Sequence, residues 1–130
     1  MEFKNKEELI DWNKLDGEQW YRLLVEQPQY AKYCDWEKIN GYNWSYLLSF
    51  QPQLADYCDW SKLKGEDWVV LLREQPQFAK YCNWDLLDNK LEWYFLLRKQ
   101  PQFAKYCPKR FRKFLIEFHP KYFRKMFEED

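Results

Sequence analysis

The chain of 130 residues contains no threonine, three serines, three glycines and one histidine. This scarcity removes most side chains that catalysis uses. The sequence holds no serine, histidine and aspartate set, and we expect His119, which precedes a proline, to be a surface residue and not a general base. The three glycines are isolated, so there is no glycine-rich phosphate loop. We therefore predict a protein that is not an enzyme and has no cofactor.

Net charge and long apolar runs are also absent. Basic and acidic residues both number 21, so net charge gives no reason to expect nucleic acid or a membrane surface as a partner. No apolar run approaches the roughly 20 residues of a membrane span, and the N-terminus has no signal-peptide core. No segment alternates apolar and polar residues, which predicts no β-strand. We expect a soluble, cytoplasmic protein.

Aromatic residues, in contrast, make up 22% of the chain, with eight Trp, ten Tyr and ten Phe. This is abundant material for a core and argues against disorder. A chain of this length forms one domain and buries roughly two thirds of its unfolded surface.

Most of the aromatic residues belong to a tandem repeat. A fixed period in this range is typical of solenoids, in which each unit buries its apolar side against its neighbours. We predict an all-α, short-period solenoid: an N-terminal cap at 1–10, four repeats at 11–107 and a C-terminal cap at 108–130. The period is 24 residues and is set by Trp12, Trp36, Trp60 and Trp84 and by Pro28, Pro52 and Pro76, with Pro101 one residue late.

One unit, residues 11–34, predicts two short helices and a turn. Its apolar residues follow helical spacing from Trp20 to Gln27, on a helix that starts near residue 16 or 17. Pro28 ends this helix, because a residue before proline is pushed out of the α region, and it opens a second, short helix. A turn of α or 3₁₀ type follows Asp35. Two tryptophan rows are expected to lie buried along the stack, namely Trp12, Trp36, Trp60 and Trp84, and Trp20, Trp44, Trp68 and Trp93.

The ends of the array depart from the repeat. Asn5 and Glu8 have the spacing of a capping box, which predicts a first half-unit. The fourth unit carries one inserted residue near 88–91, where Asn89 is aligned with the glycine of the other units. After Cys107 the Asp-Trp-x-Lys-Leu segment is missing. These changes are typical of capping repeats.

One cysteine occurs in each repeat, always at the equivalent position. Equivalent positions in stacked helical units lie about 8–10 Å apart. A disulfide requires Cα atoms within about 7 Å, and a Zn–S bond is about 2.3 Å long. We therefore predict reduced, metal-free thiols that fill space between helices, at Cys34, Cys58, Cys82 and Cys107.

The unit Asp-Trp-x-Lys-Leu-x-Gly-x-x-Trp-x-x-Leu-Leu-x-x-Gln-Pro-Gln-Phe-Ala-x-Tyr-Cys covers residues 11–107. It resembles tandem repeats of uncharacterised bacterial proteins, to which no activity is attached. Its period is similar to that of the leucine-rich repeat variant, a solenoid of alternating α and 3₁₀ helices, although the residue pattern differs. The resemblance implies an architecture and carries over no catalytic or ligand residue.

Paired glutamines flank every proline of the repeat. A row of amides is able to read a linear polymer, but an amide at a helix junction also satisfies backbone groups that the proline leaves open. The identity of all copies favours the structural role. The pairs are Gln27 and Gln29, Gln51 and Gln53, Gln75 and Gln77, and Gln100 and Gln102.

Positions that vary between repeats indicate where a partner binds. On the first helix of each unit they form two flanks that we expect to face solvent. Many are apolar or aromatic, as on interaction surfaces. We predict a scaffold for protein–protein interaction. The alternative is that these variable positions are buried by a further layer, a superhelical groove or a homodimer. The predicted partner-binding residues are Tyr46, Phe50, Val69, Val70, Arg73, Tyr94 and Phe95.

The C-terminal cap supplies a second functional hypothesis. Residues 108–130 hold seven basic and four acidic side chains, with phenylalanines interleaved. This composition suits single-stranded nucleic acid or another polyanion. It also suits an amphipathic end-cap with Phe inward and cations in water, which is the interpretation that we favour. The candidate anion-binding residues are Lys109, Arg110, Arg112 and Lys113.

Overall fold

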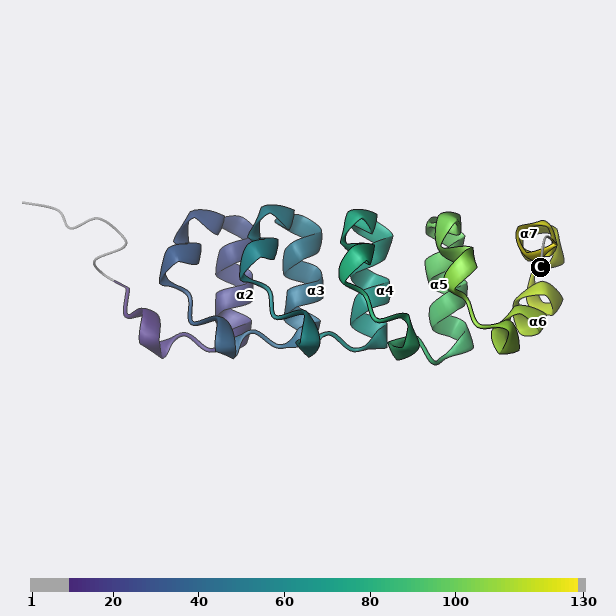
Figure 1. Cartoon of the computed structure of the whole chain (residues 1–130). Coiled ribbons are helices and arrows are strands. Elements are labelled where there is room, and N and C mark those ends of the chain that lie inside the picture. Colours follow the sequence, from purple (N-terminus) through teal and green to yellow (C-terminus); the bar gives the residue numbers. More distant parts are fainter. Residues whose placement is uncertain (1–9, 129–130) are drawn as a thin grey trace, which may run out of the picture.

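The computed structural model describes residues 10–128 as one row of helical units (Figure 1). It contains six α-helices and eight 3₁₀ helices, with no strand in the described residues. The predicted all-α solenoid is therefore confirmed. The proposed capping box at Asn5 and Glu8 lies outside the described residues.

Each repeat consists of a three-residue 3₁₀ turn, a ten-residue α-helix and a six-residue 3₁₀ helix. The second helix is thus of the 3₁₀ type in every unit. The units are η1 (Trp12–Lys14), α2 (Gly17–Glu26) and η2 (Pro28–Tyr33); η3 (Trp36–Lys38), α3 (Gly41–Phe50) and η4 (Pro52–Tyr57); η5 (Trp60–Lys62), α4 (Gly65–Glu74) and η6 (Pro76–Tyr81); and η7 (Trp84–Leu86), α5 (Lys90–Lys99) and η8 (Pro101–Tyr106). Two further helices, α6 (Lys109–Phe118) and α7 (Pro120–Phe127), close the row.

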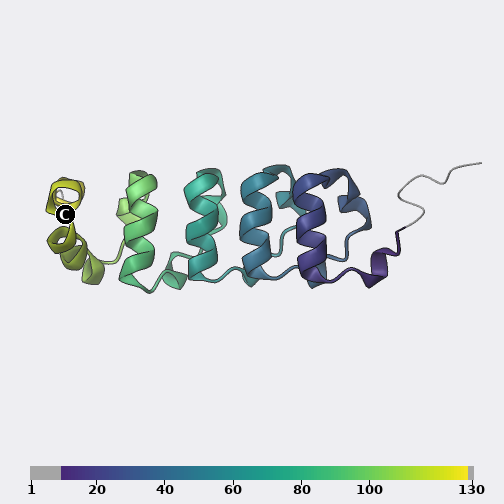
Figure 2. The same cartoon turned by 180° about the vertical axis from the view of Figure 1, so that it is seen from behind.

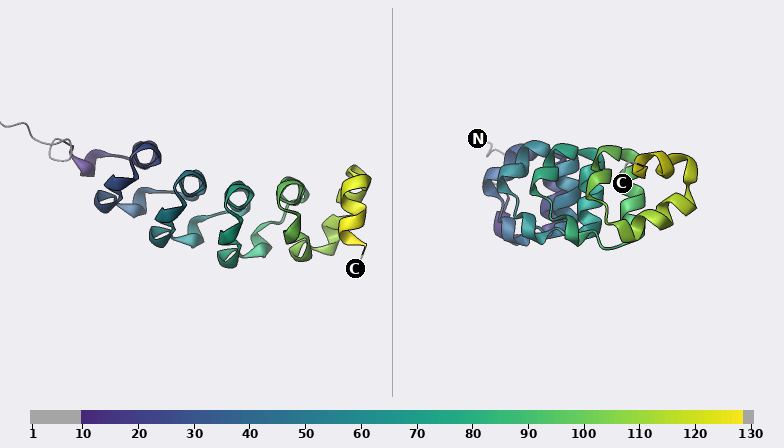
Figure 3. Two further views of the ribbon diagram at one scale, coloured as in Figure 1. Left: turned by 90° about the horizontal axis from the view of Figure 1, so that it is seen from above. Right: turned by 45° about the vertical axis from the view of Figure 1, so that its right-hand side comes forward.

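The row has two different faces. The α-helices lie side by side along one face, which is seen from the front in Figure 2. The six-residue 3₁₀ helices follow the opposite face, as the view from above shows (Figure 3, left). The three-residue turns lie along the edge where the α-helices begin (Figure 1).

Local signals place the helix boundaries as predicted. The Asp16 carboxylate accepts a hydrogen bond from the Gln19 amide at 2.8 Å, and the Gln19 side chain accepts one from the Asp16 amide at 2.9 Å. This reciprocal pair is a capping box that starts α2. The helix ends at Gln27, whose φ of −136° has left the helical region before Pro28.

The tryptophan rows form the spine of the core. Trp20, Trp44, Trp68 and Trp93 are between 0% and 1% exposed, which confirms their predicted burial. The other row is half-buried. Trp12, for example, stacks on Trp20 with ring centroids 5.4 Å apart and on Tyr33 with centroids 4.6 Å apart. The half-buried row, which begins with Trp12, therefore covers the buried row, which begins with Trp20, from the edge of the stack.

Glycine at the first position of the α-helix allows close approach of the next repeat. A Cβ on Gly41 would lie 2.1 Å from the carbonyl oxygen of Lys62. The fourth repeat has Lys90 at this position, and Asn89 is the preceding N-cap. The alignment of Asn89 with the glycine was therefore wrong. A side chain is tolerated at Lys90 because the Asp-Trp-x-Lys-Leu turn that would pack there is missing after Cys107.

The repeated glutamines join neighbouring units. The Nε2 atoms of Gln51, Gln75 and Gln100 donate to main-chain carbonyls near the end of the preceding α-helix, at 2.7, 3.0 and 2.9 Å. The second glutamine of a pair bonds the first, as when Gln53 donates to Gln51 at 2.8 Å. The geometry supports the structural interpretation of these amides.

All four thiols are free, and each is half-buried or buried. Burial raises the pKa of each thiol to about 12; Asp35 and Asp59 add to this for Cys34 and Cys58, whereas Arg112 opposes it at Cys107. Thiolate is the reactive form of cysteine. The cysteines of the stack are therefore placed as packing residues with low reactivity.

Alkylation should report this burial directly. At pH 8 a pKa of about 12 leaves roughly one thiol in 10⁴ ionised, so we expect iodoacetamide to modify none of the four cysteines of the folded protein within minutes. In denaturant all four should react, as counted by intact-mass spectrometry. Rapid modification of the folded chain, or a mass deficit that reveals a disulfide, would contradict the packing role.

Candidate interaction face

The centre of the α-helical face carries an uninterrupted row of aromatic side chains. Tyr42, Tyr46 and Phe50 are spaced four residues apart and lie on the same side of α3. Tyr42 is 59% exposed and Phe50 is 60% exposed. The rings of Tyr42 and Tyr46 are 5.0 Å apart. We call these three residues the aromatic stripe.

The stripe is peculiar to α3, which has no charged residue. The equivalent positions of α2 are Glu18, Arg22 and Glu26, which is the usual composition of a solvated helix face. Large exposed apolar side chains cost solubility when they have no partner. The open side of α3 is thus aromatic where that of α2 is charged.

A groove runs between the stripe and the next helix. Its volume is ≈ 310 Å³. We call it the α3–α4 groove, and it combines aromatic walls with one acid and one base. It is lined by Tyr46, Ser49, Phe50, Val70, Arg73 and Glu74.

The charges of this groove are unequally neutralised. The Glu74 carboxylate is paired with Lys99, with Nζ and Oε1 2.6 Å apart. The Arg73 guanidinium makes no hydrogen bond or ion pair with any described residue, and its Nε is buried without a partner. Its equivalent in the next repeat, Arg98, instead donates to the Tyr94 hydroxyl at 2.6 Å. Arg73 is thus the cation of this groove that is free to meet an acidic group.

The structure brings four of the predicted partner-binding residues together, namely Tyr46, Phe50, Val70 and Arg73. Phe95 lies on α5 and is 48% exposed. Tyr94 is half-buried, and its ring meets that of Phe118 at 5.1 Å. Tyr94 is therefore partly used in packing the C-terminal helices.

The expectation that Val69 faces solvent was wrong. Val69 is 7% exposed, and Ser45, at the equivalent position of α3, is 0% exposed. Each inner helix of the row packs against a helix on either side, so the flank that carries Val69 and Ser45 is covered by a neighbour. Only the strip that points away from the 3₁₀ layer stays open.

Sequence reasoning missed Tyr42. A signal was present, because Tyr42 precedes Tyr46 by one helical turn and differs from Glu18 and Glu66 at the same position of other repeats. Its exposed fraction of 59% makes it one of the most open aromatic side chains of the face.

The basic cap is only partly available to an anion. Lys109, Arg110 and Lys113 are exposed on α6. Arg112 is half-buried: its Nε donates to the Cys107 carbonyl at 3.0 Å, and its guanidinium lies 5.1 Å from the centre of the Phe127 ring. Arg112 thus holds α6 and α7 in place, and the four residues do not form one open cluster.

The histidine of the chain lies among aromatic rings. His119, expected at the surface, is half-buried, with Tyr122 and Phe123 edge-on to its ring at 6.0 and 6.5 Å. Residues 10–128 bring together no group of three metal-ligating side chains of the His, Cys, Asp or Glu type. No helix in this part of the chain has the length and apolar character needed to cross a bilayer.

Comparisons with models of protein families, with curated proteins and with solved structures find no match.

Proposed function

We propose that the protein is a non-catalytic interaction module that binds a protein partner through the aromatic stripe and the α3–α4 groove. The observation that carries this proposal is the 59% and 60% exposure of Tyr42 and Phe50, in the first and last turns of a helix without charged residues. Aromatic residues and arginine are enriched among the residues that dominate binding energy. The repeat scaffold holds them on a rigid support, which reduces the entropy lost on binding.

The surroundings of the stripe fit this role. The flanking helices are held by core tryptophans and inter-repeat hydrogen bonds, so the groove exists before a partner arrives. Residues at the rim are polar or charged, as Glu66 and Glu74 show. An apolar centre with a polar rim is the usual composition of a protein interface. A cytoplasmic location remains our prediction for this module.

Capture from an extract of the native host tests the proposal. The bait variants are wild type, Tyr46→Ala with Phe50→Ala, and a control with Glu18→Ala and Glu26→Ala at exposed positions of α2. The double aromatic variant should lose the partner and keep its circular dichroism spectrum and melting temperature. With a purified partner the loss should be at least about 30-fold in Kd, the effect of roughly 2 kcal/mol. The α2 control should bind like wild type.

Four results would redirect the proposal. Equal capture by the double aromatic variant would place the functional face elsewhere. Unfolding of that variant would show that the stripe serves stability. Binding that disappears on charge reversal at Lys109, Arg110 and Lys113, and that weakens steeply with salt, would favour the polyanion alternative. Concentration-dependent sedimentation abolished by the same aromatic changes would identify a second copy of this chain as the partner.

A further inference from the structure

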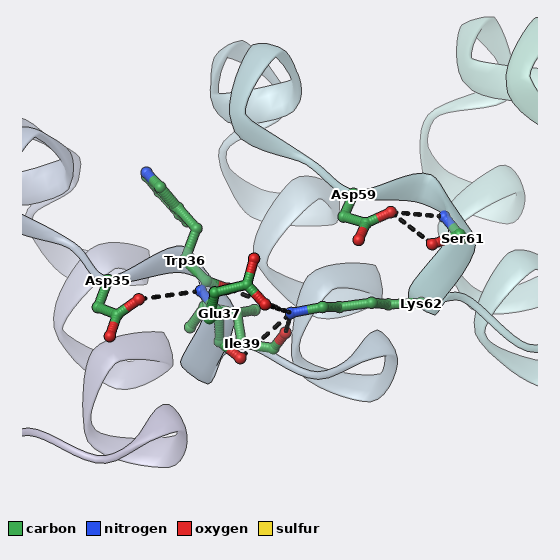
Figure 4. Close-up of polar contacts among 7 residues, drawn as sticks. All are labelled: Asp35, Trp36, Glu37, Ile39, Asp59, Ser61 and Lys62. Carbon is green, nitrogen blue, oxygen red and sulfur yellow. Dashed lines mark hydrogen bonds and ion pairs between the residues drawn. The ribbon is translucent and has the colours of Figure 1, made fainter.

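The three-residue 3₁₀ turns form receptors for a lysine ammonium. In Figure 4, the Lys62 Nζ lies against the turn of the preceding repeat. It donates to the carbonyls of Trp36, Glu37 and Ile39 at 3.4, 3.2 and 3.1 Å. The Glu37 carboxylate is 3.9 Å away and adds charge complementarity. We call this set of converging carbonyls the carbonyl crown.

The same contact occurs one repeat earlier. Lys38 Nζ donates to the carbonyls of Asn13 and Leu15 at 2.9 and 2.8 Å. The lysine of the Asp-Trp-x-Lys-Leu motif therefore docks into the crown of the unit before it. Hydrogen bonds from a charged donor are the stronger kind, and three carbonyls match the three N–H groups of an ammonium.

The third crown has no lysine. The residue of the fourth repeat that is equivalent to Lys38 and Lys62 is Leu86. The turn Trp60–Leu63 nevertheless keeps the backbone of the turn Trp36–Ile39, with φ and ψ at the last residue of −81° and 127° against −87° and 119°. The following unit also packs in the same place, because Gly65 lies directly against the Leu86 carbonyl. The third crown therefore keeps the backbone shape of the second, although a leucine stands where the lysine would be.

The last carbonyl of the turn shows the difference most clearly. No described residue donates a hydrogen bond to the carbonyls of Ser61 or Leu63. The three equivalent carbonyls all have a side-chain donor: Lys38 for Leu15 at 2.8 Å, Lys62 for Ile39 at 3.1 Å and Trp93 for Leu87 at 2.7 Å.

Acidic groups surround the third crown. Glu66, Asp88 and Glu92 line a hollow of ≈ 420 Å³ beside the turn, together with a single lysine, Lys64. The pKa of Glu92 is raised by its desolvation and by the neighbouring Asp88 and Glu66. Its Oε1 atom is buried without a partner. A cation in this hollow would relieve the repulsion among these carboxylates.

We propose that the turn Trp60–Leu63, with Glu66, Asp88 and Glu92, binds a primary ammonium, supplied by a lysine side chain of a partner protein. The site lies on the edge of the row where the α-helices begin, next to the α-helical face. It does not depend on the aromatic stripe. The chain itself shows the binding mode, because Lys38 and Lys62 make it in the two preceding crowns.

Titration of the full chain with a small probe tests the site. The probe is Nα-acetyl-lysine methylamide, and the control is the norleucine analogue, which has an apolar side chain of similar shape and no charge. Two-dimensional NMR should show saturable shifts of the backbone amides of 61–66 and 88–92 with the lysine probe only. Tyr46→Ala with Phe50→Ala should respond like wild type, which separates this site from the proposed interaction face.

Leu86→Lys supplies the missing ammonium from within the chain. We expect this variant to lose the response to the probe and to gain about 3–6 °C in melting temperature, with Leu86→Met as the matched control that gains neither. Equal shifts with the norleucine probe would overturn the proposal. So would an unchanged response of the Leu86→Lys variant. Calcium ions that shift the same amides at lower concentration would make the hollow a metal site and overturn the lysine assignment.

Discussion

Replacing Trp44 by alanine is expected to lower the free energy of unfolding by about 3–5 kcal/mol, the cost of removing a large buried aromatic side chain. Trp44 is 0% exposed, and its ring stacks on that of Trp36 with centroids 5.1 Å apart. Its Nε1 has no hydrogen-bond partner, so the loss comes from packing alone. Because domains of this size are stable by about 5–15 kcal/mol, the change removes a large part of the total.

Urea unfolding followed by far-ultraviolet circular dichroism measures this loss. The matched control is Tyr42→Ala on the same helix, where the side chain is 59% exposed and the expected change is within about 0.5 kcal/mol. A Trp44→Ala protein that melts at the wild-type temperature and fails to bind its partner would show that the row is a recognition platform.

Substituting Gly41 by alanine should cost about 3 kcal/mol, the upper part of the range for overpacking. The added Cβ would lie 2.1 Å from the Lys62 carbonyl oxygen and 2.7 Å from a carboxylate oxygen of Asp67. The first of these atoms belongs to the main chain and moves only if the third repeat shifts as a whole. The substitution therefore acts on the joint between two repeats.

Lys90→Ala is the control for this joint, since Lys90 opens α5 as Gly41 opens α3. No repeat turn packs against Lys90, so its replacement should change stability by less than about 1 kcal/mol. Gly17→Ala should behave like Gly41→Ala, because its Cβ would lie 2.1 Å from the Lys38 carbonyl oxygen. A Gly41→Ala protein as stable as wild type would show that the repeats are not held in this register.

The sequence predicts the interior of one repeat well. Helical spacing from Trp20 and the break at Pro28 are local signals, and the structure confirms both the predicted start near residue 16 or 17 and the predicted end before Pro28. The 3₁₀ type of the segment after Pro28 was less accessible. Proline opens α and 3₁₀ helices equally well, and six residues offer few α-type hydrogen bonds to favour the α form.

The contacts between repeats were harder to predict. Helical angles assign faces within one unit, but the burial of Val69 depends on where the neighbouring helix lies. The carbonyl crown joins atoms more than twenty positions apart, as in the bond from Lys62 to Ile39. Its only signal in the sequence is a lysine at 14, 38 and 62 that becomes leucine at 86. The structure explains what this change does: Leu86 leaves the third crown without a lysine.

The joints between repeats have a consequence for how such an array changes over generations. The repeated lysine, glycine and glutamine each contact a main-chain carbonyl of the adjoining unit, as Lys62, Gly41 and Gln75 do. A main-chain carbonyl is the same in every residue type, so these contacts do not depend on the side chains of the neighbour. A unit that keeps these three residues is therefore interchangeable with its neighbours, whatever its exposed side chains are. Duplication or loss of a whole unit lengthens or shortens the row without redesigning a joint, and the open helix face is left free to diversify.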